Sequence, residues 1–172
     1  EGINEEIAAA AELIKNAEKP FIYAGGGVVS ADATEEMAEF ARKVDAPVSL
    51  SLMGQCALDN TKDCYIGMLG MHGTKTAAMT LGECDLMIVL GSRFSDRVLC
   101  NAKTFAKDKK IIHIDIDPAE IGKNIETDIP LVGDCKAILT ELTDYIEKKD
   151  RSEWLSELNE VKNSVPTENE TE

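Results

Sequence analysis

Short apolar segments that end at or beside a glycine recur along this chain of 172 residues. The clearest is Leu86–Leu90, where an uninterrupted apolar run is followed directly by Gly91. Such runs are typical of strands that are buried on both faces of a parallel sheet. We expect strands at 21–24, 47–52, 65–66, 86–90, 110–115 and 129–132.

Helical patterns separate these expected strands. Residues 1–19 carry apolar side chains at helical spacing, and Pro20 ends that helix. A second helix should begin at Asp32, whose side chain would cap it, with Glu35 three residues later. Further helices are expected at 74–81, from Pro118 and over 138–146. This alternation predicts an α/β, Rossmann-like fold: a doubly wound, mostly parallel sheet of six strands with helices on both faces.

The pattern divides the chain near residue 150. Residues 1–150 are expected to form one nucleotide-binding domain, and 151–172 a C-terminal helix or linker that is partly disordered. In this last segment Trp154, Leu158 and Val161 share one helical face. A lone tryptophan on a terminal helix is usually docked against a neighbour. The polar, acidic end that follows predicts high mobility beyond Asp150.

Charge and cysteine content exclude several classes of protein. The formal net charge of −14 argues against a nucleic-acid partner or an anionic membrane surface. No apolar run approaches the roughly 18 residues that span a bilayer, and no signal peptide is recognisable. Five cysteines without a C-x-x-C pair fit reduced thiols in a cytoplasmic protein. Each is expected to be a small buried apolar residue, with a catalytic cysteine as the alternative.

Glycines cluster where the expected strands end, at 25–27, 54, 70–73, 91 and 133. In a doubly wound sheet, ligands bind outside the carboxyl ends of the strands. The run Gly67–Gly73 adds Met71, a soft lining for a flat apolar group, and His72, a polar contact. This run suits a cofactor cradle, and a glycine-rich loop before a helix is the alternative.

A standard NAD site is not favoured at the first glycine turn. Residues 25–30 read Gly-Gly-Gly-Val-Val-Ser, so Ser30 stands where a Rossmann turn has its third glycine. The acid expected about 20 residues later, at the end of the next strand, is missing from Ser49–Leu52.

Carboxylates follow two later strands. Asp115 and Asp117 close the strand at 110–115, and Asp134 follows the strand at 129–132. A carboxylate at a strand end can accept hydrogen bonds from ribose hydroxyls or from an adenine amine. The alternative is that Asp115 or Asp117 caps a helix that begins at Pro118. We favour ligand contact for Asp115, and both readings stay open for Asp117.

The segment Gly91–Arg97 has features of an anion site. Backbone N–H groups of such a turn at a helix N-terminus favour anions, and the guanidinium of Arg93 suits phosphate or carboxylate. A surface ion pair with Asp96 is the alternative. No general acid–base set stands out, because only two histidines are present and His113 lies within an apolar strand. We interpret the chain as a module that holds a nucleotide cofactor and performs no bond chemistry alone.

Several segments, taken in order, carry a family resemblance. They read PFIYAGGG at 20–27, SLMG at 51–54, MLGMHGT at 68–74, GSRFSDRV at 91–98 and HIDIDPAEIGKN at 113–124. Together they resemble the central domain of the large subunits of acetolactate synthase (acetohydroxyacid synthase), within the thiamine-diphosphate enzymes. The resemblance runs from about residue 3 to residue 148, and the last two segments are specific to this family.

The resemblance implies that this central domain supplies much of an FAD site. Asp96 and Arg97 match positions near the substrate channel of the family. The family often has Asp where Ser95 stands here, so a backbone contact is implied at that position. The implied cofactor contacts are Gly26, Ser51, Leu52, Leu69, Gly70, Met71, His72, Gly91, Ser92, Arg93, Phe94, Ser95, Asp115, Ile116, Asp134 and Cys135.

The resemblance also implies what the whole enzyme does. It condenses two pyruvates, or pyruvate and 2-oxobutyrate, with loss of CO2 in branched-chain amino acid biosynthesis. It uses thiamine diphosphate and Mg²⁺, and it holds an FAD that is not needed for net redox chemistry. The family's catalytic glutamate and its G-D-G…N-N thiamine-diphosphate motif are not found in this chain. We therefore expect an excised central domain with no catalytic residue and no metal site, inactive alone.

The implied partners are the flanking domains of the same polypeptide and a second copy in a homodimer, with a regulatory subunit as a further candidate. Two other readings stay open. One is the central domain of a different thiamine-diphosphate carboligase or decarboxylase that lacks FAD. The other is a free-standing nucleotide-binding or subunit-interaction module.

Overall fold

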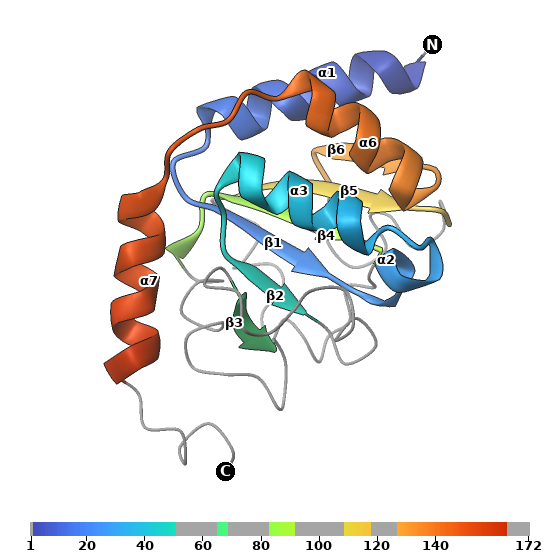
Figure 1. The fold of residues 1–172 in the computed structure, drawn as a ribbon. Coiled ribbons are helices and arrows are strands. Elements are labelled where there is room, and N and C mark those ends of the chain that lie inside the picture. The colour runs from blue at the N-terminus through green and yellow to red at the C-terminus, as the bar shows by residue number, and fades with distance from the viewer. Residues whose placement is uncertain (1, 51–64, 69–82, 92–108, 118–126, 165–172) are drawn as a thin grey trace.

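The computed structural model describes residues 2–50, 65–68, 83–91, 109–117 and 127–164 (Figure 1). Along the chain the elements are α1 (Gly2–Asn16), β1 (Pro20–Ala24), α2 (Gly26–Ser30), α3 (Thr34–Val44), β2 (Val48–Leu50), β3 (Tyr65–Met68), β4 (Leu86–Leu90), β5 (Lys110–Asp115), β6 (Ile129–Val132), α6 (Cys135–Tyr145) and α7 (Ser152–Ser164). The expected helix at 74–81, the helix from Pro118 and the last two residues of the strand expected at 47–52 lie outside the described residues.

The described strands form one sheet in the order β3-β2-β1-β4-β5-β6. Every neighbouring pair is parallel, from β2 beside β3 at one edge to β5 beside β6 at the other. The predicted parallel α/β fold is therefore confirmed. β1 and β4 lie side by side at the centre, with Ala24 opposite Leu90 at their carboxyl ends.

Both faces of the central strands are buried, as their uninterrupted apolar runs predicted. Helices α1, α2, α3 and α6 lie over one face (Figure 1). They enclose a core that includes Ile22, Leu90 and Ile112. On the opposite face Tyr23 and Val89 are also buried. The alternate residues of each strand are thus removed from water on the two sides of the sheet.

The expected cap of the second helix is wrong. Helix α3 begins at Thr34 with Ala33 as its N-cap residue, and no side chain caps it. Asp32 instead has a φ of 55°, in the left-handed region that Asp tolerates better than most residues. Its N–H donates to Val29 O at 3.0 Å, which closes the short helix α2. The physical reason is that the chain must turn between two closely spaced helices, and Asp32 makes that turn.

At the amino end of the sheet, Asp85 joins the start of β4 to the start of β1. Its Oδ2 accepts a hydrogen bond from Glu18 N–H at 2.8 Å, and its Oδ1 accepts one from Lys19 N–H at 2.9 Å. Its own N–H donates to Lys19 O at 3.0 Å. One aspartate therefore fixes the register of the two central strands where they begin.

Replacing Asp85 with Ala should lower the free energy of unfolding by about 2 kcal/mol, because two hydrogen bonds to a charged acceptor are lost. Urea denaturation followed by circular dichroism measures this change. Asp144→Ala, at an exposed position on α6, is the control and should change stability by less than about 0.5 kcal/mol. Equal stabilities of the two variants would contradict this role of Asp85.

Candidate functional site at the carboxyl edge of the sheet

The strand order reverses direction at the carboxyl ends of β1 and β4. From β1 the chain proceeds outward to β2 and β3, whereas from β4 it proceeds to β5 and β6 on the other side. The order therefore reverses between the two central strands. In open α/β sheets, this reversal is where ligands bind. The residues that follow the two strands here are Gly25–Gly27 and Gly91.

The backbones of Gly27 and Gly91 meet at this reversal. Gly27 N–H donates to Gly91 O at 2.8 Å. A Cβ atom on Gly27 would lie 2.7 Å from Gly91 Cα, and Gly91 has a φ of +57°. Neither position can carry a side chain without a backbone shift. The contact also uses the Gly27 N–H within the protein, so this turn does not offer it to a phosphate as a Rossmann turn would.

Hydrogen bonds continue the sheet by one residue beyond the ends of three strands. Gly25 N–H donates to Leu90 O at 2.9 Å, and Gly91 N–H donates to Ile114 O at 2.8 Å. Gly133 N–H donates to Asp115 O at 2.9 Å. These bonds bring predicted site residues from four strand ends into one row. The row comprises Gly26, Gly91, Asp115, Ile116, Asp134 and Cys135.

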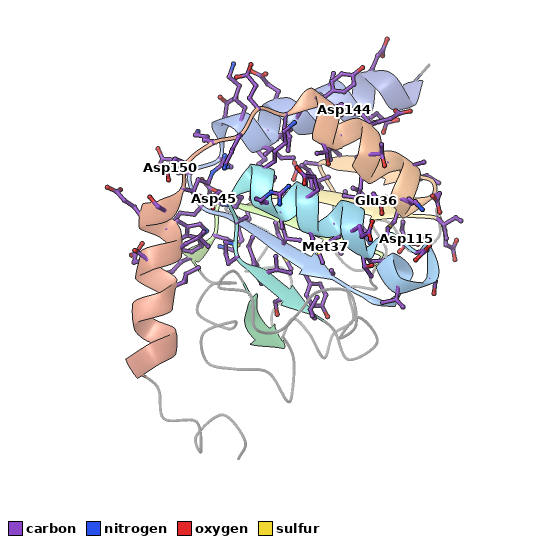
Figure 2. The ribbon with its side chains drawn as sticks, in the orientation of Figure 1. Glu36, Met37, Asp45, Asp115, Asp144 and Asp150 are labelled. Atoms are coloured by element: carbon purple, nitrogen blue, oxygen red, sulfur yellow. The ribbon has the colours of Figure 1, made fainter. Side chains whose placement is uncertain are left out.

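Asp115 presents a fixed carboxylate in this row. The residue is 9% exposed, and its Oδ1 accepts a hydrogen bond from Asp117 N–H at 3.0 Å. Its Oδ2 lies 3.7 Å from Nε2 of the buried His113. Figure 2 shows Asp115 at the same end of the sheet as α2. Asp115 thus forms the turn after β5. The helix that it or Asp117 would cap in the alternative reading would begin at Pro118, which lies outside the described residues.

Asp134 and Cys135, which were predicted to contact the cofactor, also have structural roles. Asp134 is the N-cap residue of α6, and its Oδ2 accepts a hydrogen bond from Ala137 N–H at 3.1 Å. The Cys135 side chain belongs to the core beneath the helices. Burial, followed by the charges of Asp115 and Asp134, raises the pKa of the Cys135 thiol to about 12. This thiol is therefore neutral at ordinary pH and buried in the core.

Apolar side chains flank the carboxylates at this edge. Ile116 is 71% exposed, directly after Asp115. Val132 is 43% exposed and pairs in register with Asp115. Ile116 was among the predicted contacts, whereas Val132 was expected to face the core as an apolar strand residue. The proline in this edge strand was the available signal, since proline is confined to edges.

The other predicted site residues lie outside the described part of the chain. Three of them closely follow strands that end at the same edge: Ser51 follows β2, Leu69 follows β3, and Ser92 follows Gly91 at the end of β4. They remain predictions, as do the substrate-channel residues. The set is Ser51, Leu52, Leu69, Gly70, Met71, His72, Ser92, Arg93, Phe94, Ser95, Asp96 and Arg97.

Two negative findings concern only the described residues. Within them, no group of three or more His, Cys, Asp or Glu side chains is arranged to hold a metal ion. In the same part of the chain, no helix combines the length and the apolar character needed to cross a membrane.

Gly91→Ala should lower the free energy of unfolding by at least about 2 kcal/mol, because the new Cβ meets the Gly27 backbone and the φ is positive. Thermal or urea denaturation measures the loss. Ser30→Ala, at an exposed position at the end of α2, serves as the control and should be nearly neutral. A Gly91→Ala variant as stable as the control would show that the two backbones do not need to touch.

Alkaline pH should destabilise the fold through Cys135. Its pKa is raised from near 9 to about 12, so the folded state keeps a proton that the unfolded state loses. This stabilisation is complete below pH 9 and declines by about 1.4 kcal/mol per pH unit as the pH rises toward 12. Cys135→Ala should show a shallower alkaline decline in urea denaturation than Ser156→Ala, an exposed control. Parallel declines would refute the buried neutral thiol.

The comparisons with known proteins agree with this fold. Residues 7–142 match the family described as "Thiamine pyrophosphate enzyme, central domain". The chain is 47% identical over 165 residues to a probable acetolactate synthase large subunit of Methanocaldococcus jannaschii, which covers 94% of the chain and 28% of that relative. It is 43% identical over 169 residues to the acetolactate synthase of Mycobacterium leprae, covering 95% and 27%.

A third relative, the acetolactate synthase large subunit of Corynebacterium glutamicum, is 44% identical over 166 residues, covering 94% of the chain and 26% of its own length. The chain thus spans little more than a quarter of these relatives. The family match covers most of the chain and includes every described strand. This chain belongs to the family of thiamine pyrophosphate enzyme central domains.

Proposed function

We propose that this chain is the central domain of an acetolactate synthase large subunit and that the carboxyl edge of its sheet holds FAD. The observation that carries the proposal is the row of glycines and carboxylates at the reversal between β1 and β4. The names of the relatives support the enzyme. The FAD role rests on the chemistry of the edge and on the resemblance in sequence.

The described residues fit a dinucleotide in three ways. At Gly27 and Gly91 the two backbones fill the space that a Cβ would take, so the ends of β1 and β4 continue as main chain without side chains at these positions. The carboxylates of Asp115 and Asp134 can accept hydrogen bonds from ribose hydroxyls. Ile116 and Val132 offer exposed apolar surface for a flat ring. The work of this domain is therefore binding and orientation of the cofactor, which is not needed for net redox chemistry.

The whole enzyme would condense two pyruvates, or pyruvate and 2-oxobutyrate, with loss of CO2. Thiamine diphosphate and Mg²⁺ would be held by parts of the enzyme other than this chain. In this proposal the chain works with flanking domains of its own polypeptide, in a cytoplasmic homodimer with a regulatory subunit as a further candidate partner. The purified chain should accordingly form no acetolactate from pyruvate, thiamine diphosphate and Mg²⁺.

Titration of FAD with the purified chain tests the binding role. We expect saturable quenching of flavin fluorescence, with about tenfold weaker binding by Asp115→Asn, because the amide loses the charged acceptor but keeps the turn to Asp117. Asp144→Asn, at an exposed position on α6, is the matched control and should bind as the unaltered chain does.

Two outcomes would contradict the proposal. The first is the absence of saturable FAD binding, which would favour the central domain of a thiamine-diphosphate enzyme without FAD. The second is equal affinity in the Asp115→Asn variant and its control, which would place any bound FAD away from this edge. A circular dichroism spectrum of each variant confirms that the comparison is made between folded proteins.

A further inference from the structure

The chain enters helix α7 through a buried arginine. Arg151 is 5% exposed and directly precedes Ser152, the first residue of α7. Its N–H donates to Asp45 Oδ2 at 2.7 Å. Asp45 itself terminates α3 in the left-handed conformation. Figure 2 shows Asp45 and Asp150 together at the end of the sheet opposite Asp115. This junction is therefore remote from the candidate site.

The Arg151 guanidinium joins the ends of two helices. Its Nε donates to Ala17 O at 3.1 Å, and its Nη2 donates to Ala17 O and to Ile14 O. Its Nη1 donates to Val44 O. The last carbonyls of a helix lack partners within the helix and carry the negative end of its dipole. One cation thus satisfies carbonyls at the ends of both α1 and α3.

Trp154 extends the contact by one helical turn. It is 4% exposed, and its Nε1 donates to Pro20 O, at the start of β1, at 2.9 Å. Lys19 Nζ lies 5.4 Å from the centre of its ring, a distance suited to a cation–π contact. Leu158, one turn further, is also buried. In Figure 1, α7 stands at the amino end of the sheet and points away from the helices above it.

These contacts lie outside the main core. The apolar cluster that joins α1, α2, α3, α6 and the sheet contains neither Trp154 nor Leu158. Within the described residues, each acceptor of the Arg151 side chain is a backbone carbonyl at a helix end, a group that water can satisfy if α7 departs. Among the described residues, the side-chain hydrogen bonds from α7 and its start to other elements come from Arg151 and Trp154.

We propose that Arg151 and Trp154 form an anchor that fixes the direction of α7, so that α7 is a rigid arm whose attachment can be lost without unfolding the sheet. The relatives extend well beyond the length of this chain. An anchored helix would set the direction in which a longer polypeptide leaves the domain. This inference is independent of FAD binding.

Trp154 is the single tryptophan of the chain, so its fluorescence reports directly on the anchor. Arg151→Met removes the donors but keeps a long apolar stem. In this variant we expect the Trp154 emission to shift to longer wavelength. We also expect acrylamide to quench it more strongly, because the indole ring becomes exposed to solvent. Hydrogen exchange of amides 152–158 should accelerate by about 10- to 100-fold, while the amides of β1, β4 and β5 keep their protection. Lys136→Met, exposed on α6, is the matched control and should leave both signals unchanged.

Each remaining outcome overturns the proposal. Buried tryptophan emission in Arg151→Met would show that the arginine does not hold α7. Loss of protection throughout the sheet, or failure of this variant to fold, would show that α7 is part of the core and not a separable arm. Arg151→Lys keeps the charge but not the fork of donors, so it should release Trp154 less than Arg151→Met does.

Discussion

The backbone contact between Gly27 and Gly91 is the constraint on which the arrangement of this molecule depends. It brings together the chain segments that follow β1 and β4, so that Gly27 N–H and Gly91 O form a hydrogen bond of 2.8 Å at the carboxyl ends of the two central strands. Because no side chain fits between them, the reversal of strand order ends in bare main chain. The neighbouring turns then extend the sheet in register. The backbone groups of the glycines and the carboxylates of Asp115 and Asp134 therefore lie in one row along the carboxyl edge of the sheet.

The two ends of the sheet have opposite chemistry. At the amino end, polar groups satisfy each other: the Asp85 carboxylate accepts N–H groups from the start of β1, and Arg151 donates to carbonyls of α1 and α3. At the carboxyl end, Asp134 and Asp115 each use one oxygen in a local turn, and the other oxygen of Asp115 lies 3.7 Å from Nε2 of His113. Structural polar groups are thus concentrated away from the edge that we propose for the cofactor.

Much of the fold could be predicted because β1 and β4 are apolar without interruption, which is typical of strands buried on both faces. The wrong assignment of Asp32 shows the limit, since the same residue type favours both a helix cap and a left-handed turn. Arg151 had no sequence signal, because a charged residue before a helix is usually exposed. The strand ends predicted the edge that we propose for the cofactor, but the Gly27–Gly91 contact depends on chain segments far apart in sequence.

The most direct test of the proposed cofactor edge is the position of FAD on the folded chain. When FAD is added to the 15N-labelled chain, we expect the largest changes in amide chemical shift at Gly26, Gly91, Ile116 and Asp134. These residues lie along the carboxyl ends of β1, β4, β5 and β6. The amides around Arg151 at the opposite end should not move. Shifts centred on the Arg151 end, or spread without preference over the sheet, would contradict the assignment of this edge as the cofactor site.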